Sequence, residues 1–282
     1  MKSLFIACFC LVSCSLFAQE SVTLRLWENG APNSNGITEK EYEPRKDRIT
    51  NVTDPTLTIY PAENPNGKAV IMCPGGGYSL VAIHHEGFQM ADWFNSMGIT
   101  YAVLKYRMPN GNKEVPLSDA HRAIELMREN SEKWDIDKVG IMGCSAGGHL
   151  ASTAATHYTA ENRPDFQILL YPVINMNAEI THVGSRNQLL GKNASVDDLD
   201  YYSNELQVSA DTPPAFIVHS SDDAVVPVKN SIDYYMSLIN NKVSASLHIY
   251  PTGGHGWGFN DNFKYKDEWT TELGVWLKNL EL

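Results

Sequence analysis

The sequence predicts an α/β protein with a mainly parallel central sheet of about eight strands and helices on both faces. The main observation is that, from residue 68 onward, short apolar runs of strand length alternate with longer stretches of helical spacing. This alternation is typical of parallel sheets, in which helices connect the strands. The chain has 282 residues, of which 43% are hydrophobic, and this is enough to bury the core of a single domain.

The elements are predicted in order along the chain. Residues 19–66 are polar, and their two β-like runs, 22–27 and 57–60, are expected at the edge of the sheet. Continuous apolar runs predict buried strands at 69–73, 101–106, 139–142, 167–171, 215–219 and 245–250. Helical spacing predicts helices at 86–97, 117–134, 146–157, 229–239 and 266–280. Asn- and Asp-rich sequence at 174–210 interrupts this pattern, which predicts an insertion or lid over the carboxyl edge of the sheet.

The first eighteen residues have the features of a targeting segment. Lys2 precedes an apolar stretch at 4–12, and the segment ends in the small residue Ala18. Because the apolar stretch is too short to span a bilayer, residues 1–18 are predicted to be a signal peptide. The mature protein would then be a single domain, 19–282, exported to the periplasm or secreted.

A second interpretation of the leader remains open. Residues 11–14 resemble a bacterial lipobox, in which Cys14 would carry a lipid anchor. The rest of the chain contains no further run of 18 apolar residues, so no membrane span is expected. Beyond the leader only Cys73 and Cys144 remain. We expect both to be small buried residues, with a single disulfide between them as the alternative.

The charge of the chain limits its partners. The formal net charge is −11, which would repel the phosphates of a nucleic acid. Nucleic acid is therefore excluded as an expected partner, and a neutral substrate is favoured.

Residues 143–147 carry the strongest functional motif. They read Gly-Cys-Ser-Ala-Gly and lie between the predicted strand at 139–142 and the predicted helix at 146–157. A Gly-x-Ser-x-Gly motif between a strand and a helix is typical of a nucleophile elbow, where the turn exposes the serine hydroxyl at a helix N-terminus. The five-residue pattern also occurs by chance, but this context favours Ser145 as a nucleophile.

A glycine-rich loop follows the first buried strand. Residues 74–78 read Pro-Gly-Gly-Gly-Tyr, and glycines leave backbone N–H groups accessible to a developing oxyanion. We therefore expect the amides of Gly76, Gly77 and Ala146 to form an oxyanion hole. A flexible turn is the alternative. A dinucleotide-binding loop is not expected, because no acidic residue follows at the end of the next strand.

A serine nucleophile needs a base, and the base needs an orienting acid. Among nine histidines, His255 is the candidate base because it lies in a glycine-bounded loop after the last strand. Asp223 is the preferred acid, with Asp222 as the alternative, since both follow the strand at 215–219. His149 is expected to be a structural residue. The adjacent histidines 84 and 85 lack the spacing of a zinc site, so no metal is expected.

The order Ser, Asp, His is that of α/β-hydrolases, and the sequence resembles secreted bacterial carbohydrate esterases of that superfamily, of the acetylxylan-esterase and feruloyl-esterase type. The motifs that carry the resemblance are Pro74-Gly75-Gly76-Gly77-Tyr78, His85-Glu86-Gly87, Leu104-Lys105-Tyr106-Arg107, Gly143 to Leu150, Ser221-Asp222-Asp223 with Val226-Pro227, and Gly254-His255-Gly256. They extend over roughly residues 50–280. Related lipase-like esterases have a histidine where this chain has Pro74.

The resemblance implies a function and a substrate class. It implies a serine esterase that hydrolyses short acyl esters, preferably acetyl, on plant polysaccharides such as xylan, without a cofactor. Tyr78 and Trp257 are candidates for the wall of the substrate site, although Trp257 is also suited to packing.

Two other functions are weighed against the esterase. One is a serine exopeptidase of the prolyl-oligopeptidase kind. Such enzymes usually have a large additional β domain, which a mature chain of this length is not expected to accommodate. The other is a non-catalytic hydrolase-fold protein that binds sugar, which the presence of Ser145, Asp223 and His255 disfavours.

Overall fold

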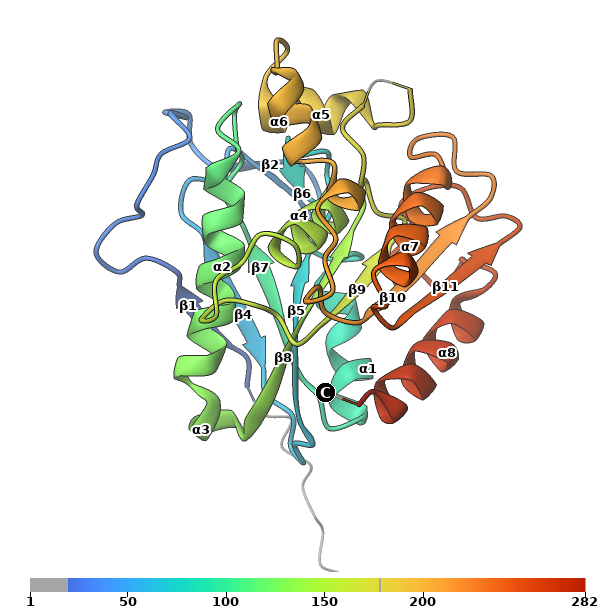
Figure 1. Ribbon diagram of the computed structural model, residues 1–282. Coiled ribbons are helices and arrows are strands. Elements are labelled where there is room, and N and C mark those ends of the chain that lie inside the picture. Colours follow the sequence, from blue (N-terminus) through green and yellow to red (C-terminus); the bar gives the residue numbers. More distant parts are fainter. Residues whose placement is uncertain (1–19, 178, 282) are drawn as a thin grey trace, which may run out of the picture.

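The computed structural model describes residues 20–177 and 179–281, so the predicted leader, with Cys14, lies outside the described residues. The fold is built around one eight-stranded sheet, mostly parallel, which confirms the predicted class (Figure 1). In sheet order, its strands are β1 (Val22–Arg25), β4 (Thr56–Tyr60), β7 (Thr100–Lys105), β5 (Gly67–Cys73), β8 (Ile136–Cys144), β9 (Phe166–Leu170), β10 (Ala215–Ser220) and β11 (Ala245–Tyr250). Only β4 pairs antiparallel with its neighbours, β1 and β7.

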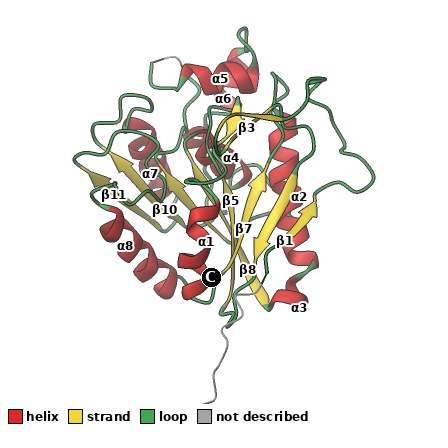
Figure 2. Ribbon diagram, turned by 180° about the vertical axis from the view of Figure 1, so that it is seen from behind, coloured by secondary structure: helices red, strands yellow, loops and turns green. Residues whose placement is uncertain are grey.

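Helices cover both faces of the sheet. Figures 1 and 2 show one face covered by α2 (Glu114–Glu129), α4 (Ala146–Ala154) and α7 (Lys229–Asn240), and the other by α1 (Ala91–Ser96) and α8 (Lys266–Asn279). This two-sided cover explains the apolar runs of the central strands, because every residue of β9 and β10 is buried. All six predicted buried strands are present, each within three residues of its predicted ends.

Two of the predicted helices are divided in the structure. The first half of 86–97 is replaced by the 3₁₀ turn η1 (Phe88–Met90), which runs into α1. The stretch predicted at 117–134 is α2 followed by α3 (Ser131–Trp134), and α2 begins earlier than predicted, at Glu114. Pro116 does not prevent this start, because the first turn of a helix needs no backbone N–H donors.

Two regions were not predicted as regular structure. Residues 42–50 form a hairpin of β2 (Tyr42–Arg45) and β3 (Arg48–Thr50), which joins β6 (Leu80–Val81) in a separate three-stranded sheet. The predicted insertion contains α5 (Val183–Leu190), α6 (Val196–Tyr201) and the 3₁₀ turn η2 (Asn204–Leu206). In Figure 1, α5 and α6 lie above the sheet, at the end where β2 and β6 also lie.

Cys73 and Cys144 are buried free thiols, which confirms that they are small core residues and not a disulfide. Among the described residues, no helix combines the length and apolarity needed to cross a bilayer.

Candidate active site

Ser145 lies on the turn between β8 and α4, as the motif predicts. Its backbone has φ 54° and ψ −121°, a region that costs an L-residue energy and that is found mainly at functional sites. The two flanking glycines permit this turn. A Cβ atom at Gly143 would overlap the carbonyl oxygen of Gly147, and one at Gly147 would overlap that of Cys73. The side chain of Ser145 is thereby placed at the N-terminus of α4.

The structure brings the three predicted catalytic residues into one hydrogen-bonded chain. Nε2 of His255 lies 2.8 Å from Oγ of Ser145, and Nδ1 lies 2.6 Å from Oδ2 of Asp223. Because a carboxylate can only accept, Nδ1 carries the imidazole proton and donates it to Asp223. Nε2 is therefore free to accept the hydroxyl proton of Ser145, which is the arrangement that activates a serine.

The carboxylate of Asp223 is held by three further donors. Oδ1 accepts from the backbone N–H groups of Val225 and Val226, each at 2.9 Å. Oδ2 also lies 3.2 Å from Nε2 of His219. Burial opposes ionisation of this carboxyl, but the hydrogen bonds from His219 and His255 outweigh burial and hold the pKa of Asp223 well below its ordinary value. Asp223 is thus fixed as an anion beside the imidazole.

Asp222, the alternative acid, has a different position. It is exposed, and its Oδ1 accepts a hydrogen bond of 2.8 Å from the backbone N–H of Gly254. Asp222 thereby tethers the loop that carries His255, while Asp223 contacts the imidazole itself.

The glycine loop lies beside Ser145. Oε2 of the buried Glu86 accepts from the amide of Gly75 at 2.8 Å, so this amide is already engaged. Among the described residues, the amides of Gly76, Gly77 and Ala146 have no hydrogen-bond acceptor. These are the three N–H groups that the sequence analysis predicts for the oxyanion hole.

A cavity of about 500 Å³ opens above Ser145. Its lining comes from the glycine loop, the β2–β3 hairpin, the insertion and the His255 loop, and includes Arg48, Gly76, Gly77, His85, Glu86, Ser145, His182, Gln188, Val225 and His255. The predicted insertion therefore contributes one wall of the cavity through His182 and α5.

Tyr78 does not line this cavity, and its predicted substrate contact is wrong. Its side chain is 1% exposed, and its hydroxyl donates to Nδ1 of His149 at 2.9 Å. Nε2 of His149 in turn donates to the backbone oxygen of Tyr202 at 2.8 Å. Burial lowers the pKa of His149 to about 4. This neutral imidazole thus fastens the glycine loop to the elbow helix and the insertion, which is the structural role predicted for His149.

Trp257 also faces the core. Its ring stacks on Phe263 with centroids 4.1 Å apart, and its Nε1 donates to Oγ of Ser220 at 3.1 Å. With 5% of the residue exposed, it is a packing residue. The expectation that it lines the substrate site is wrong, and the packing alternative is the one observed.

Three residues of the site received no role in the sequence analysis. Glu86 accepts from the hydroxyl of Tyr171 at 2.9 Å as well as from the amide of Gly75. His219 contacts the carboxylate of Asp223. Arg48 lines the cavity. The motif His85-Glu86-Gly87 pointed to Glu86, but no local pattern pointed to Arg48, which lies 97 positions before Ser145 in the chain.

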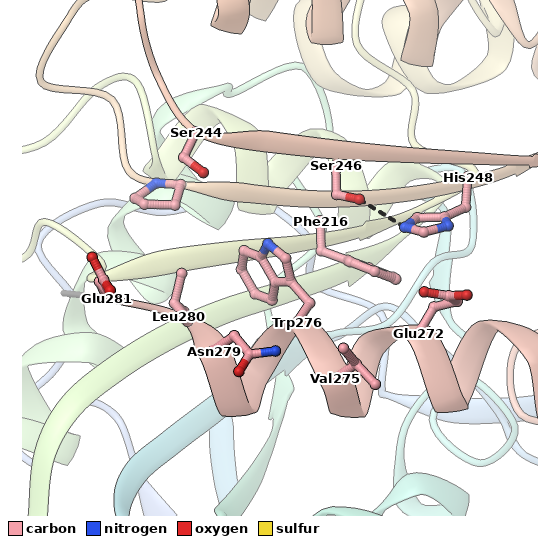
Figure 3. A pocket seen from close by; sticks show the side chains of 11 residues that line it. Phe216, Ser244, Ser246, His248, Glu272, Val275, Trp276, Asn279, Leu280 and Glu281 are labelled. Atoms are coloured by element: carbon pink, nitrogen blue, oxygen red, sulfur yellow. Dashed lines mark hydrogen bonds between the residues drawn. The ribbon is translucent and has the colours of Figure 1, made fainter.

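A second cavity of about 500 Å³ lies between α8 and the strands β10 and β11 (Figure 3). Oγ of Ser246 lies 2.7 Å from Nε2 of His248, and Glu272 is nearby on α8. Ser246 and His248 lie on an extended strand, so within residues 20–177 and 179–281 neither a helix N-terminus nor a glycine loop carries Ser246. We therefore assign the chemistry to the Ser145 cavity.

Comparisons with known proteins find similarity to an acetylxylan esterase, a xylanase and a solved hydrolase. An acetylxylan esterase of Xylanibacter ruminicola is 44% identical over 230 residues, 79% of this chain and 48% of that protein. Endo-1,4-beta-xylanase B of Butyrivibrio fibrisolvens is 37% identical over 66% of this chain and 32% of its own length. An acetyl ester-xyloside bifunctional hydrolase from Caldicellulosiruptor lactoaceticus superposes with a TM-score of 0.79 at 38% identity, covering 91% of this chain and 95% of that one.

The chain spans about half the length, or less, of these two curated relatives. Residues 89–281, which include the elbow, Asp223 and His255, match the prolyl oligopeptidase family. Together with the eight-stranded sheet and the similarity to the solved hydrolase, this match shows that the chain belongs to the prolyl oligopeptidase family of α/β-hydrolases.

Proposed function

We propose that the protein is a serine esterase that removes short acyl groups, chiefly acetyl, from xylan or related plant polysaccharides. The observation that carries the proposal is the hydrogen-bonded chain Ser145–His255–Asp223 at the floor of an open cavity. The names of its relatives, an acetylxylan esterase and an acetyl ester-xyloside hydrolase, support the ester bond and the sugar.

The first half of the reaction acylates the enzyme. Nε2 of His255 takes the hydroxyl proton while Oγ of Ser145 bonds to the carbonyl carbon of the ester. The carbonyl oxygen becomes an oxyanion, which the amides of Gly76, Gly77 and Ala146 would stabilise. Each such donor contributes about 3 kcal/mol in other serine hydrolases.

The second half releases the products. As the tetrahedral intermediate collapses, the bond to the sugar oxygen breaks and His255 returns its proton to that oxygen. Water then attacks the acyl-enzyme, His255 accepts the proton of the water, and the carboxylic acid leaves as the Ser145 hydroxyl is restored. Asp223 keeps Nδ1 protonated and stabilises the imidazolium in both halves.

The test measures acid release from acetylated xylan, beside p-nitrophenyl acetate, methyl ferulate and an aminoacyl-proline p-nitroanilide. We expect acetate from xylan with the wild-type protein and none above background with Ser145→Ala. Cleavage of p-nitrophenyl acetate alone would refute xylan as the substrate. Cleavage of the aminoacyl-proline substrate in place of the esters would establish the exopeptidase. Inactivity of folded protein on all four would favour a sugar-binding role.

We also propose that the enzyme acts outside the cytoplasm, on the basis of the predicted leader at 1–18. Fractionation of expressing cells tests this directly. Protein in the medium or periplasm with Gln19 at its N-terminus would support cleavage after Ala18, and a membrane-associated form that Cys14→Ser releases would support the lipid anchor.

A further inference from the structure

Basic side chains gather at one margin of the Ser145 cavity, although the chain as a whole is acidic. The β2–β3 hairpin carries Arg45, Lys46 and Arg48. Strand β3 pairs with β6 directly after the glycine loop, and Oγ1 of Thr50 donates to the backbone oxygen of Ser79 at 2.7 Å. The hairpin is therefore held against the loop that borders the catalytic serine.

Arg48 lies where two cavities meet. It lines the cavity above Ser145, and it also lines an adjoining cavity of about 410 Å³. The two cavities share His85 and Gly256 as well. The adjoining cavity is further lined by Arg45, Lys46, Asp47, His84 and Asn260. Because the two cavities share these residues, we describe them together as the hairpin groove, whose lining extends from Ser145 to Arg45 and Lys46 of the hairpin.

The guanidinium of Arg48 is positioned by a neutral partner. Its Nη1 lies 2.9 Å from Nδ1 of His85, and its Nη2 lies 3.3 Å from Nε2. Burial lowers the pKa of the His85 imidazole, and Arg48 lowers it further against the opposing effect of Glu86. A neutral imidazole leaves the positive charge of Arg48 uncompensated.

The acidic neighbours of these cations form no ion pair with them. Within the described part of the chain, no carboxylate lies within 4 Å of a charged nitrogen of Arg45, Lys46 or Arg48. Asp47, on the groove rim, makes no such pair, and the carboxylate of Glu86, which accepts from Gly75 and Tyr171, lies 3.9 Å from Nε2 of His85 and not against the guanidinium of Arg48. The hairpin groove thus presents three unpaired cations to whatever occupies it.

We propose that the hairpin groove binds the carboxylate of a uronic acid that neighbours the acylated sugar, with Arg48 as the residue that selects for it. The proposal rests on the esterase function proposed above. A guanidinium has five N–H donors, so Arg48 keeps donors for a carboxylate beside its two contacts with His85. Through Nε and the remaining N–H groups of its planar fork it can bind that carboxylate with two hydrogen bonds. We assign the carboxylate to the sugar and not to the acyl group, because two of the three cations, Arg45 and Lys46, line only the adjoining cavity and not the cavity above Ser145 that a short acyl group would occupy.

The expected preference is moderate. The groove is open to solvent and screened by salt, so a charge-assisted pair at Arg48 corresponds to a preference of about 3- to 10-fold. The local charge of the site thereby overrides the expectation, drawn from net charge alone, that the substrate is neutral.

The experiment compares two sets of acetylated xylo-oligosaccharides, one with and one without a glucuronic acid side group. We expect wild-type kcat/KM to be about 3- to 10-fold higher for the acidic set, and this ratio to shrink in 0.5 M NaCl. Arg48→Gln should abolish the ratio, and Arg48→Lys, which keeps the charge without the fork, should retain part of it. Arg25→Gln is the matched control, because Arg25 is exposed on β1 and lines neither cavity.

A binding measurement separates this inference from the esterase itself. In the Ser145→Ala background, Arg48→Gln should weaken binding of a deacetylated acidic oligosaccharide about 3- to 10-fold, as measured by calorimetry. Equal kcat/KM for the two sets, or a ratio that survives Arg48→Gln, would overturn the inference and leave the esterase standing. Release of acetate from neither set would overturn both proposals.

Discussion

Two cavities of this protein contain the same pair of functional groups, and only one of them is equipped for catalysis. In each, of about 500 Å³, a serine hydroxyl contacts a histidine: Ser145 and His255 at 2.8 Å, and Ser246 and His248 at 2.7 Å. A carboxylate accompanies each pair: Asp223 contacts His255 on the side away from Ser145, and Glu272 lies near His248 in the lining of the second cavity.

The surroundings of the two pairs differ. His255 donates to Asp223 at 2.6 Å, whereas no hydrogen bond or ion pair within 4 Å joins His248 to Glu272 among the described residues. Ser145 lies at a helix N-terminus beside amides without acceptors, whereas Ser246 lies within β11. A serine next to a histidine is therefore insufficient, since the orienting acid and the oxyanion donors must be supplied by the fold.

The largest expected effect comes from the two serines. Ser145→Ala should lower kcat/KM on p-nitrophenyl acetate by at least about 10⁴-fold, because it removes the nucleophile. Ser246→Ala should leave it within about twofold of wild type. Steady-state kinetics with matched thermal unfolding curves would check this pair, and a comparable loss in both variants would contradict the assignment of the two cavities.

The two acids should differ almost as strongly. Asp223→Asn keeps the shape of the side chain but removes the charge that fixes the His255 tautomer, so kcat should fall by about 10³- to 10⁴-fold. Glu272→Gln changes the corresponding group of the second cavity and should have no effect on kcat. A small loss in Asp223→Asn would mean that another acceptor, such as Asp222, orients the imidazole.

The buried His149 should make the stability of the protein depend on pH. Its pKa is about 4 in the folded state against an ordinary 6.5, so below pH 6.5 the unfolded chain binds a proton that the folded protein refuses. The contribution of this neutral imidazole to the free energy of unfolding is fully present above pH 6.5. It is lost as the pH falls toward 4, and the total loss is about 3 kcal/mol.

Denaturant unfolding between pH 7 and pH 4 checks this prediction with His149→Gln and His248→Gln. The first substitution should remove about 3 kcal/mol of the pH-dependent loss, the share of this imidazole. The second should remove less, because His248 is only half-buried and Glu272 opposes the lowering of its pKa. An unchanged pH profile in His149→Gln would contradict the neutral, buried state of this imidazole.

The smallest expected effect concerns Glu86, a positioning residue that joins the glycine loop to the end of β9. Its carboxylate accepts from Gly75 and from Tyr171, whose ring packs edge-on against His255 with centroids 4.9 Å apart. Glu86→Gln should lower kcat about 10-fold with little change in KM, since it weakens two hydrogen bonds to a charged acceptor. A rise in KM at constant kcat would instead place Glu86 in substrate binding.

Local patterns along the chain were sufficient to predict the central strands of the sheet and the three residues Ser145, Asp223 and His255. The central strands are recognisable in the sequence as apolar runs because both faces of a parallel sheet are buried. Ser145 and His255 were found because glycines bound each of them, and glycines are required where a turn is tight or two backbone segments approach closely, as at Gly143 and Gly147.

The prediction that Tyr78 and Trp257 line the substrate site was wrong. Both stand next to catalytic motifs in the chain, but adjacency in sequence does not say to which side of a loop a side chain points. In the folded protein Tyr78 points to His149 and Trp257 to Phe263. The hairpin at 42–50 was missed because its strands are short and polar and give no buried periodic pattern.

The sequence by itself determined the α/β class and the order of the central strands along the chain, and it supplied the candidates for nucleophile, base and acid. Tertiary structure alone decided which backbone amides have no acceptor and which aromatic rings are buried away from the cavity. It also decided that Arg48 and Ser145 line the same cavity. The reason is physical: burial periodicity and glycine-dependent turns are properties of neighbouring residues. A binding surface, in contrast, is assembled from segments that become neighbours only when the sheet has formed.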